Sequence, residues 1–210
     1  MALNETKICN MSLGRFGANR INDLSDNSET IVEAIHCRLH YEQTRNELQR
    51  SHFWRFNKAR AVLSRDTETP AFEWAYQHFL PNDFLRMRSR YGANNLPDST
   101  TRNSYSLEGN LLLSNDATEK IRYSKLVTDV TQFDPLFVKV LVLELAKKLV
   151  IPLSIDEKLK IDIDTDLDKI MPKVRALDRE EGDTIRRAER STWNDALRSL
   201  GGRIDSQMGS

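Results

Sequence analysis

Apolar residues recur at the three- and four-residue spacing of an amphipathic helix in several stretches of the chain. The clearest stripe consists of Ala34, Cys37, Tyr41, Thr44 and Leu48. The same spacing predicts five helices, over residues 5–15, 28–50, 134–150, 155–170 and 172–200. The second of these is expected to be half buried against its own core or a neighbour.

The segment 155–170 fits two patterns. Its apolar residues have helical spacing, and part of it also alternates as a strand would. The alternating positions, however, are Asp162, Asp164, Asp166 and Asp168, and aspartate is disfavoured in strands. We therefore predict a helix.

Flanking residues predict where the first two helices end and begin. Gly14 and Gly17 supply the conformational freedom that stops the first helix. Asp26, with Glu29 three residues later, has the spacing of a capping box, which predicts that the second helix starts there.

The later helices carry proline signals. Asp134 and Pro135 have the composition of an N-cap and a first helical position. Pro152 is expected to end that helix, and Pro172 to begin the last one. Gly201 and the glycine after it should end the last helix, leaving residues 201–210 as a flexible tail.

Between the helices, residues 55–127 lose helical periodicity. Short apolar pieces separated by prolines predict strands and turns, with a hairpin turning at Gly109 and Asn110. The predicted fold class is mainly α: a helical bundle with a small β insertion and a long C-terminal helix. Residues 1–200 are expected to form a single domain.

Charge is balanced overall but not locally. The chain has 31 basic and 31 acidic side chains and no net charge, so it has no global attraction for DNA or anionic membranes. Arg50, Arg55, Lys58, Arg60 and Arg65 form a basic run without an intervening acid, and the aspartates of 162–168 gather in the other half.

The two cysteines, Cys9 and Cys37, are too few for a disulfide scaffold and fit assembly in a reducing cytoplasm. The N-terminal residues lack the charged and apolar regions of a signal peptide. The longest apolar run, residues 136–153, contains four charged side chains, so we expect no membrane contact.

The sequence offers no arrangement that favours catalysis, a metal or a cofactor. His36 and His40 have metal-ligand spacing, but no second ligand cluster accompanies them. The aspartates of 162–168 resemble the start of a calcium loop, but Leu167 and Lys173 occupy the positions that need Gly and Glu. We expect a protein that is not an enzyme.

The basic run is interleaved with Phe53, Trp54 and Phe56, which allows two interpretations. Arginines beside aromatics are typical of a nucleic-acid-binding surface. Alternatively, the aromatics fill the core while the arginines pair across a subunit contact, where Arg and Trp are enriched. Composition alone favours the second interpretation, because the total charge is zero.

Several short motifs occur in an order that resembles that of a known protein family. They are the opening segment Ile8–Ala18, the Trp54-Arg55-Phe56-Asn57 stretch, Trp74-Ala75-Tyr76, Leu80-Pro81, Tyr105–Gly109 and Phe133–Phe137. In this order they resemble the head-to-tail adaptor proteins of short-tailed bacteriophages, the tail tubular protein A group. The resemblance spans roughly residues 8–150.

The resemblance implies a structural virion protein, assembled in the host cytoplasm and located in the tail or neck of the virion. It implies a ring of about twelve copies between the portal protein and the tail nozzle, with genomic DNA passing through the centre without sequence specificity. Under this hypothesis the portal-docking residues are expected to be Arg186, Arg187, Trp193 and Leu197. The subunit contact is expected to involve Trp54, Arg55, Arg60 and Asp164.

Two other functions compete with this hypothesis. One is a nucleic-acid-binding module that uses the arginine and aromatic run at 50–65. The other is a cell-wall hydrolase carried in a tail, which would need a pair of acid and base carboxylates that the sequence does not indicate.

Overall fold

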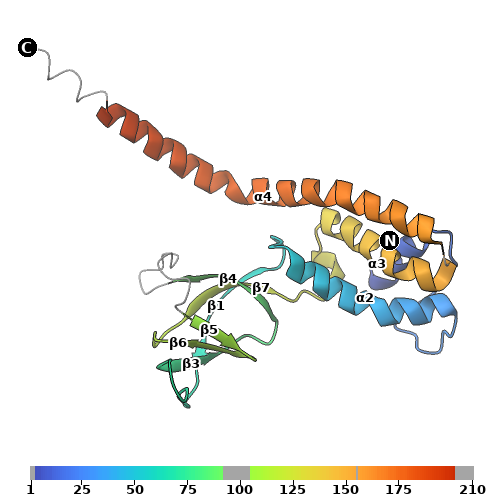
Figure 1. Ribbon diagram of the computed structural model, residues 1–210, viewed down its shortest axis with the longest axis horizontal. Helices are drawn as coiled ribbons and strands as arrows, with labels where there is room; N and C mark the ends of the chain where they lie inside the picture. The colour runs from blue at the N-terminus through green and yellow to red at the C-terminus, as the bar shows by residue number, and fades with distance from the viewer. Residues whose placement is uncertain (1–2, 92–104, 155, 202–210) are drawn as a thin grey trace, which may run out of the picture. The chain divides into compact units, whose positions relative to one another are not determined.

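The computed structural model describes residues 3–91, 105–154 and 156–201 (Figure 1). Within these ranges the chain has four α-helices and seven strands in two antiparallel sheets. The prediction of a mainly α helical bundle is therefore wrong, and the fold is mixed α/β. The sequence pattern predicted strands at 55–127 but underestimated them: the strands there form two sheets rather than a small insertion.

Three helices and the start of a fourth form a helical layer. They are α1 (Glu5–Leu13), α2 (Val32–Ser51), α3 (Pro135–Ser154) and the first part of α4 (Glu157–Gly201). The side chains of α3 dominate the core, and Leu141, Leu145 and Leu149 are fully buried. Lys147 of α3 pairs with Asp164 of α4 at 2.5 Å, which adds a polar contact at the edge of this layer.

The predicted starts of α2 and α3 have different outcomes. The Asp134 side chain accepts a hydrogen bond from the Leu136 N–H at 2.7 Å, which confirms the N-cap of α3. The capping box at Asp26 and Glu29 is wrong, because α2 begins only at Val32. Asp26 instead accepts two hydrogen bonds from Ser28, a local turn that competes with a helix.

The predictions from two prolines, that Pro152 ends a helix and that Pro172 begins one, are both wrong. Pro152 lies inside α3, and Pro172 lies inside α4, which runs without interruption where two helices were expected. A proline removes one backbone hydrogen bond, and the bonds on either side suffice for the helix to continue. The first helix ends at Leu13, and Gly17, at φ 73°, provides the left-handed position.

All seven strands lie inside the predicted insertion at 55–127. They are β1 (Lys58–Val62), β2 (Ser64–Arg65), β3 (Tyr76–Phe79), β4 (Phe84–Tyr91), β5 (Tyr105–Glu108), β6 (Leu111–Ser114) and β7 (Lys120–Lys125). One sheet has the order β1-β7-β4 and the other β2-β3-β6-β5. The hairpin of β5 and β6 turns at Gly109, whose φ of 59° confirms that prediction. A small core that includes Leu63, Leu80, Leu112, Ile121 and Tyr123 holds the strands together.

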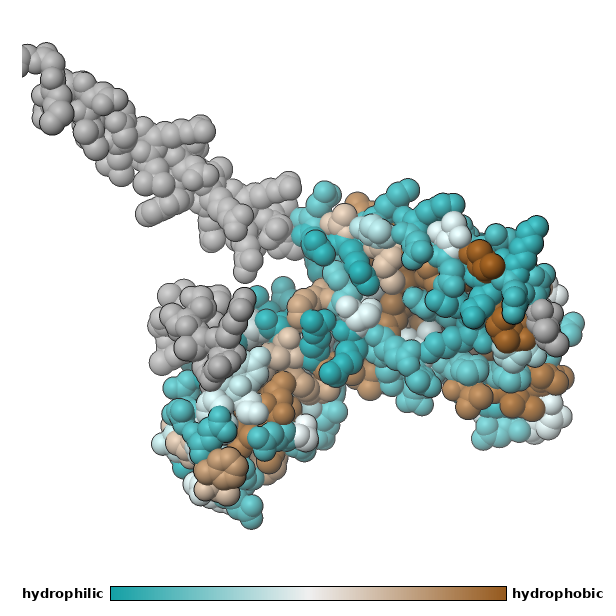
Figure 2. Space-filling model, viewed as in Figure 1, coloured by the Kyte–Doolittle hydropathy of each residue, from teal (hydrophilic) through white to brown (hydrophobic). Residues whose placement is uncertain are grey.

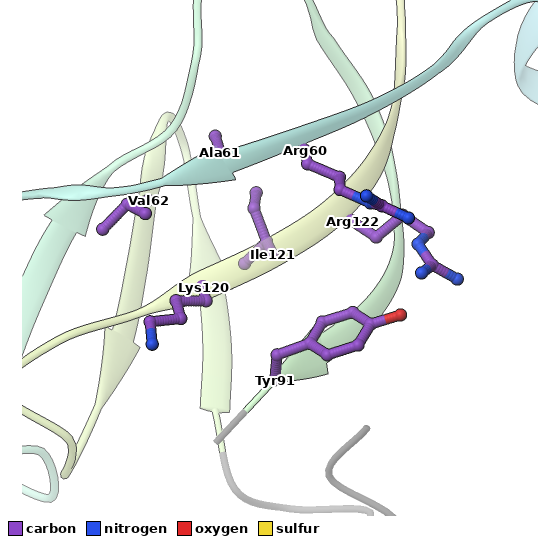
Figure 3. A pocket seen from close by; sticks show the side chains of 7 residues that line it. All are labelled: Arg60, Ala61, Val62, Tyr91, Lys120, Ile121 and Arg122. Carbon is purple, nitrogen blue, oxygen red and sulfur yellow. The ribbon is translucent and has the colours of Figure 1, made fainter. Parts of the chain in front are cut away.

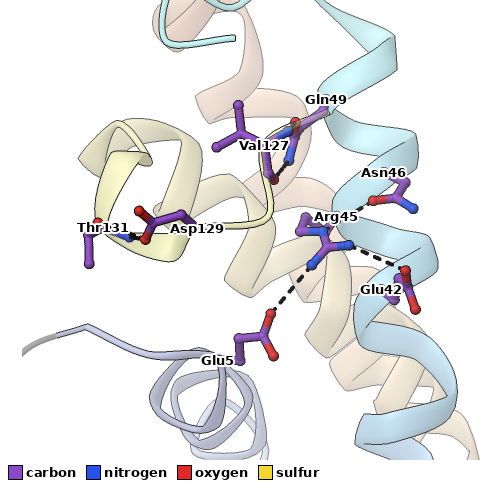
Figure 4. Close-up of polar contacts among 8 residues, drawn as sticks. All are labelled: Glu5, Glu42, Arg45, Asn46, Gln49, Val127, Asp129 and Thr131. Carbon is purple, nitrogen blue, oxygen red and sulfur yellow. Dashed lines mark hydrogen bonds and ion pairs between the residues drawn. The ribbon is translucent and has the colours of Figure 1, made fainter. Parts of the chain in front are cut away.

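Polar and aromatic contacts join the strands to the helical layer. The buried Gln49 side chain of α2 donates to the Val127 carbonyl at 2.7 Å and accepts from the Val127 N–H at 2.9 Å (Figure 4). The Trp54 ring packs edge-on against Phe137 of α3, with centroids 5.1 Å apart. These contacts fix the segments that enter and leave the β layer.

The chain divides into two compact units, residues 1–169 and 170–210. Within the described residues, the second unit consists of the remainder of α4 and contains no other helix or strand. The predicted single domain over 1–200 therefore has an internal boundary near residue 170. The predicted flexible tail lies outside the described residues, apart from Gly201, which is the last residue of α4.

Candidate functional site

The sheet of β1, β7 and β4 concentrates positive charge in a chain whose net charge is zero. β1 contributes two Lys or Arg residues, β4 three and β7 three, and none of these strands contains Asp or Glu. The second sheet shows no such bias. Of the two sheets, this one therefore carries a concentration of positive charge that the other lacks.

Strand alternation turns most of these cations to one side. Ala59, Ala61 and Ile121 pack against the small core, so their neighbours along each strand project outward. We define the cationic face as the outward side of this sheet, carrying Lys58, Arg60, Arg86, Arg88, Lys120 and Arg122.

Arg60 and Arg122 form the centre of the cationic face. They are directly paired across β1 and β7, and they line a hollow of ≈ 440 Å³ together with Lys120 and Tyr91 (Figure 3). The Arg122 guanidinium lies 5.0 Å from the centroid of the Tyr91 ring, while its buried Nε has no hydrogen-bond partner. Like charges directly opposite each other destabilise a sheet, so other contacts of the fold must offset the repulsion between Arg60 and Arg122.

The electrostatic effect of the cluster is visible at Lys58. Partial burial lowers the pKa of its ammonium, and the positive charges of Arg122, Arg88, Arg60 and Arg55 lower it further. A cation whose pKa falls because of neighbouring cations marks a positive potential on the surface. An anion placed there would be attracted by several groups at once.

The side chains of Arg88 and Arg86 are engaged in contacts within the chain. Arg88 donates to the Ser124 hydroxyl at 2.9 Å and to the Asn57 side-chain oxygen at 2.6 Å, and it also bonds the Trp54 carbonyl. The Arg86 guanidinium lies 4.3 Å from the centroid of the Phe53 ring. These contacts attach β4 to the segment that leads into β1.

The aromatic half of the run at 50–65 belongs mostly to the core. Trp54 is 1% exposed, and Phe56 packs against Phe137 with centroids 4.8 Å apart. The interpretation that the aromatics fill the core is confirmed for these two residues. Phe53 is the exception, because it remains 39% exposed beneath Arg86.

The basic residues of the same run separate. Lys58 and Arg60 lie on the cationic face, whereas Arg50 donates to the Leu85 carbonyl at 2.6 Å and Arg65 stacks over the Tyr76 ring. The run therefore contributes only two residues, Lys58 and Arg60, to the cationic face. The sequence analysis did not identify the basic residues of β4 and β7 as part of this cluster. The signal that could have shown it is that both short segments contain Lys or Arg but no acidic residue.

The four residues predicted for a subunit contact occupy different environments. Trp54 is buried in the core, so its side chain cannot reach a neighbouring subunit, and that prediction is wrong. Asp164 pairs with Lys147 of the same chain. Arg55 is exposed before β1, and Arg60 lies on the cationic face. The predicted portal-docking residues have helical backbone in α4, and their side chains lie outside the described residues.

The histidines and acids considered as metal ligands do not converge. His36 and His40 stack with ring centroids 6.1 Å apart. Within the part of the chain that the structure describes, no three His, Cys, Asp or Glu residues gather as a metal site would require. None of the helices in the same part is both long and apolar enough to cross a membrane.

A comparison of the sequence with known protein families finds no match, and a comparison with curated proteins finds none either.

Proposed function

We propose that this chain is a structural virion protein, a head-to-tail adaptor that joins the portal to the tail nozzle and lines the DNA channel. The proposal rests first on the ordered motifs that resemble the adaptors of short-tailed bacteriophages. The structural observation that carries it is the division of the chain into a packed unit and a separate helical one.

The helical unit is built to acquire a partner. Ile170, Val174 and Leu177 recur at helical spacing; Val174 is 1% exposed, whereas Leu177 is 48% exposed. A single amphipathic helix gains most of its stability by packing its apolar face on another surface. The exposed Leu177 leaves part of this face uncovered and able to contact another surface. Docking on the portal would supply it.

Further along α4 we propose Arg186, Arg187, Trp193 and Leu197 as the portal-docking residues. Arg and Trp are the side chains most enriched among the residues that dominate binding energy at protein interfaces. Replacing Trp193 with alanine should therefore reduce portal docking more than replacing the neighbouring Asn194.

An exposed apolar stripe on α2 supports assembly into a ring. Ile31, Val32, Ile35 and Leu39 lie on one side of this helix and are 39–64% exposed. Figure 2 shows hydrophobic side chains gathered over the start of α2. A ring subunit needs surfaces that bind different surfaces of its neighbour, and exposed apolar patches mark such contacts.

The test is the native mass of the chain alone and after mixing with the portal ring from the same source. The adaptor predicts addition of about twelve copies of the 24.3 kDa chain to each portal ring. A Trp193→Ala chain should bind fewer copies, and an Asn194→Ala chain should bind as the unmodified chain does. A chain that never associates with the portal overturns the proposal.

A nucleic-acid-binding module is the second candidate function, and the cationic face favours it. The form of this candidate that used the aromatics of 50–65 loses support, because Trp54 and Phe56 are packed in the core. A binding module would hold DNA but ignore the portal, so the same mixing experiment separates the two candidates.

A further inference from the structure

Arg60 and Arg122 differ from Arg90, another arginine of the same sheet. Arg90 is buried and pairs with Glu119 at 2.7 Å and with Asp116. Arg60 and Arg122 have no acidic partner among the described residues. Two guanidinium groups side by side, open to a hollow and lacking carboxylates, fit an external anion, because arginine binds phosphate through two parallel hydrogen bonds.

We propose that the cationic face binds the phosphate backbone of double-stranded DNA, independently of base sequence, with Arg60 and Arg122 at its centre. The inference rests on the proposed adaptor function, and it names the surface of the adaptor that meets the passing DNA. Lys58 and Lys120 extend the contact on either side of the arginine pair.

The composition of the face favours nucleic acid over an acidic protein. Protein interfaces have an apolar core that is depleted of charge. The cationic face instead has charged side chains at its centre, with Val62 as its exposed aliphatic residue. Interfaces with DNA are more polar and much more positive than those between proteins.

The aspartates of 162–168 in a second copy of the chain fit the cationic face less well than DNA does. Lys158 and Lys160 interrupt the acids at the start of α4, and Asp164 already pairs with Lys147. The apolar stripe on α2 provides a separate surface for copy-to-copy contact. The cationic face therefore remains for a different ligand.

The aromatic rings near the face favour backbone contact over base recognition. Arg122 lies over the Tyr91 ring, and Arg86 lies over the Phe53 ring. A ring covered by a guanidinium has less surface on which a base could stack, and base stacking is how single strands are held. Contacts that reach only phosphates carry no sequence information.

Contact of this kind suits DNA that must move. Sequence-independent binding through phosphates permits a protein to slide along a duplex. Because the whole chain has no net charge, any attraction for DNA must come from a local cluster of cations such as this face. The expected binding is therefore local and strongly dependent on salt.

The first measurement is fluorescence anisotropy of the full chain with two duplexes of about 30 base pairs and unrelated sequence, at several salt concentrations. Both should bind equally. About four phosphate contacts predict a slope of about −3.6 for log K against log salt, a loss of about 150-fold between about 50 and 200 mM. No binding at the lowest salt, or a clear sequence preference, overturns the inference.

The second measurement uses matched variants. The R60E/R122E chain should lose binding at every salt concentration tested. R60Q/R122Q, which removes charge without reversing it, should bind with its salt slope reduced by about two. R15E/R20E makes the same charge change as R60E/R122E at exposed positions outside the sheet and should bind as the unmodified chain does. Unchanged binding in both Arg60/Arg122 variants overturns the inference.

Native mass with the portal separates this inference from the adaptor function. If the unmodified chain joins the portal but binds no duplex, the inference fails and the adaptor stands. If it binds duplex through the cationic face but never joins the portal, the adaptor fails. If R60E/R122E blocks association between copies while DNA binding is unchanged, the face is a protein contact and the inference is overturned.

Discussion

Arg60 of β1 and Arg122 of β7 are directly opposite each other in an antiparallel sheet, and neither has an acidic partner among the described residues. Such a pair works against the stability of the sheet that contains it. Groups that lower stability are often retained for function, because activity and stability are separate demands on a sequence. If replacing one arginine of the pair stabilises the chain, the pair is retained for a reason other than stability.

Arg60→Gln should stabilise the chain. It removes the repulsion with Arg122 while leaving an exposed polar side chain, so the free energy of unfolding should rise by about 0.2–1 kcal/mol. Thermal melts at low salt would measure the gain, which should shrink as salt increases. Arg15→Gln, an exposed change outside the sheet, should have no comparable effect. A loss of stability in Arg60→Gln would contradict the assignment of repulsion.

Arg90→Met should be strongly destabilising. It leaves the Glu119 carboxylate, which is 1% exposed, without the cation that lies 2.7 Å away. Breaking a buried pair in this way costs about 3–5 kcal/mol. Urea unfolding would measure the loss. The double variant R90M/E119M should recover most of it, because no uncompensated buried charge remains: Asp116, which also pairs with Arg90, is 65% exposed. A double variant as unstable as the single one would refute the pairing.

Gln49→Leu should weaken the connection between α2 and the segment after β7. The N–H and the carbonyl of the buried Val127 would both lose their partner. Leaving two buried backbone groups unsatisfied should lower the free energy of unfolding by about 2–4 kcal/mol. Urea unfolding of this variant beside Gln43→Leu, an exposed position on the same helix, provides the comparison. Equal stability of the two variants would refute the bridging role.

Tyr123 should make stability fall at high pH. Burial first, and then the hydrogen bond to Asp83 together with the negative charge of that carboxylate, raise the pKa of its phenol from the ordinary value of 10.0 to about 12. Between these values the unfolded chain loses the proton first, so the stabilisation that is complete below about pH 10 declines toward pH 12.

Chemical denaturation from about pH 9 to 11 would follow this decline. In Tyr123→Phe the decline should be smaller, because the titrating group is gone, although the lost bond to Asp83 should lower stability at every pH. An identical pH profile in both chains would show that Tyr123 is not the source.

Local signals predicted the elements that local chemistry controls. The N-cap at Asp134 and the turn at Gly109 depend on a few adjacent residues, and both predictions are confirmed. The start of α2 was wrong because Asp26 could also form a turn with Ser28, and the sequence does not reveal which alternative wins. Pro172 was interpreted as a helix start, but the bonds around it continue α4.

The sequence by itself determined which parts of the chain are helical, although not every helix boundary, and it determined the hairpin, the zero net charge and the basic run at 50–65. Only the tertiary structure decided that the fold is mixed α/β and that most aromatics of the run fill the core. It also decided that β7 lies between β1 and β4, which places Arg60 beside Arg122. The physical reason is that strand pairing depends on contacts between residues far apart in the chain, whereas helix caps and turns depend on neighbours.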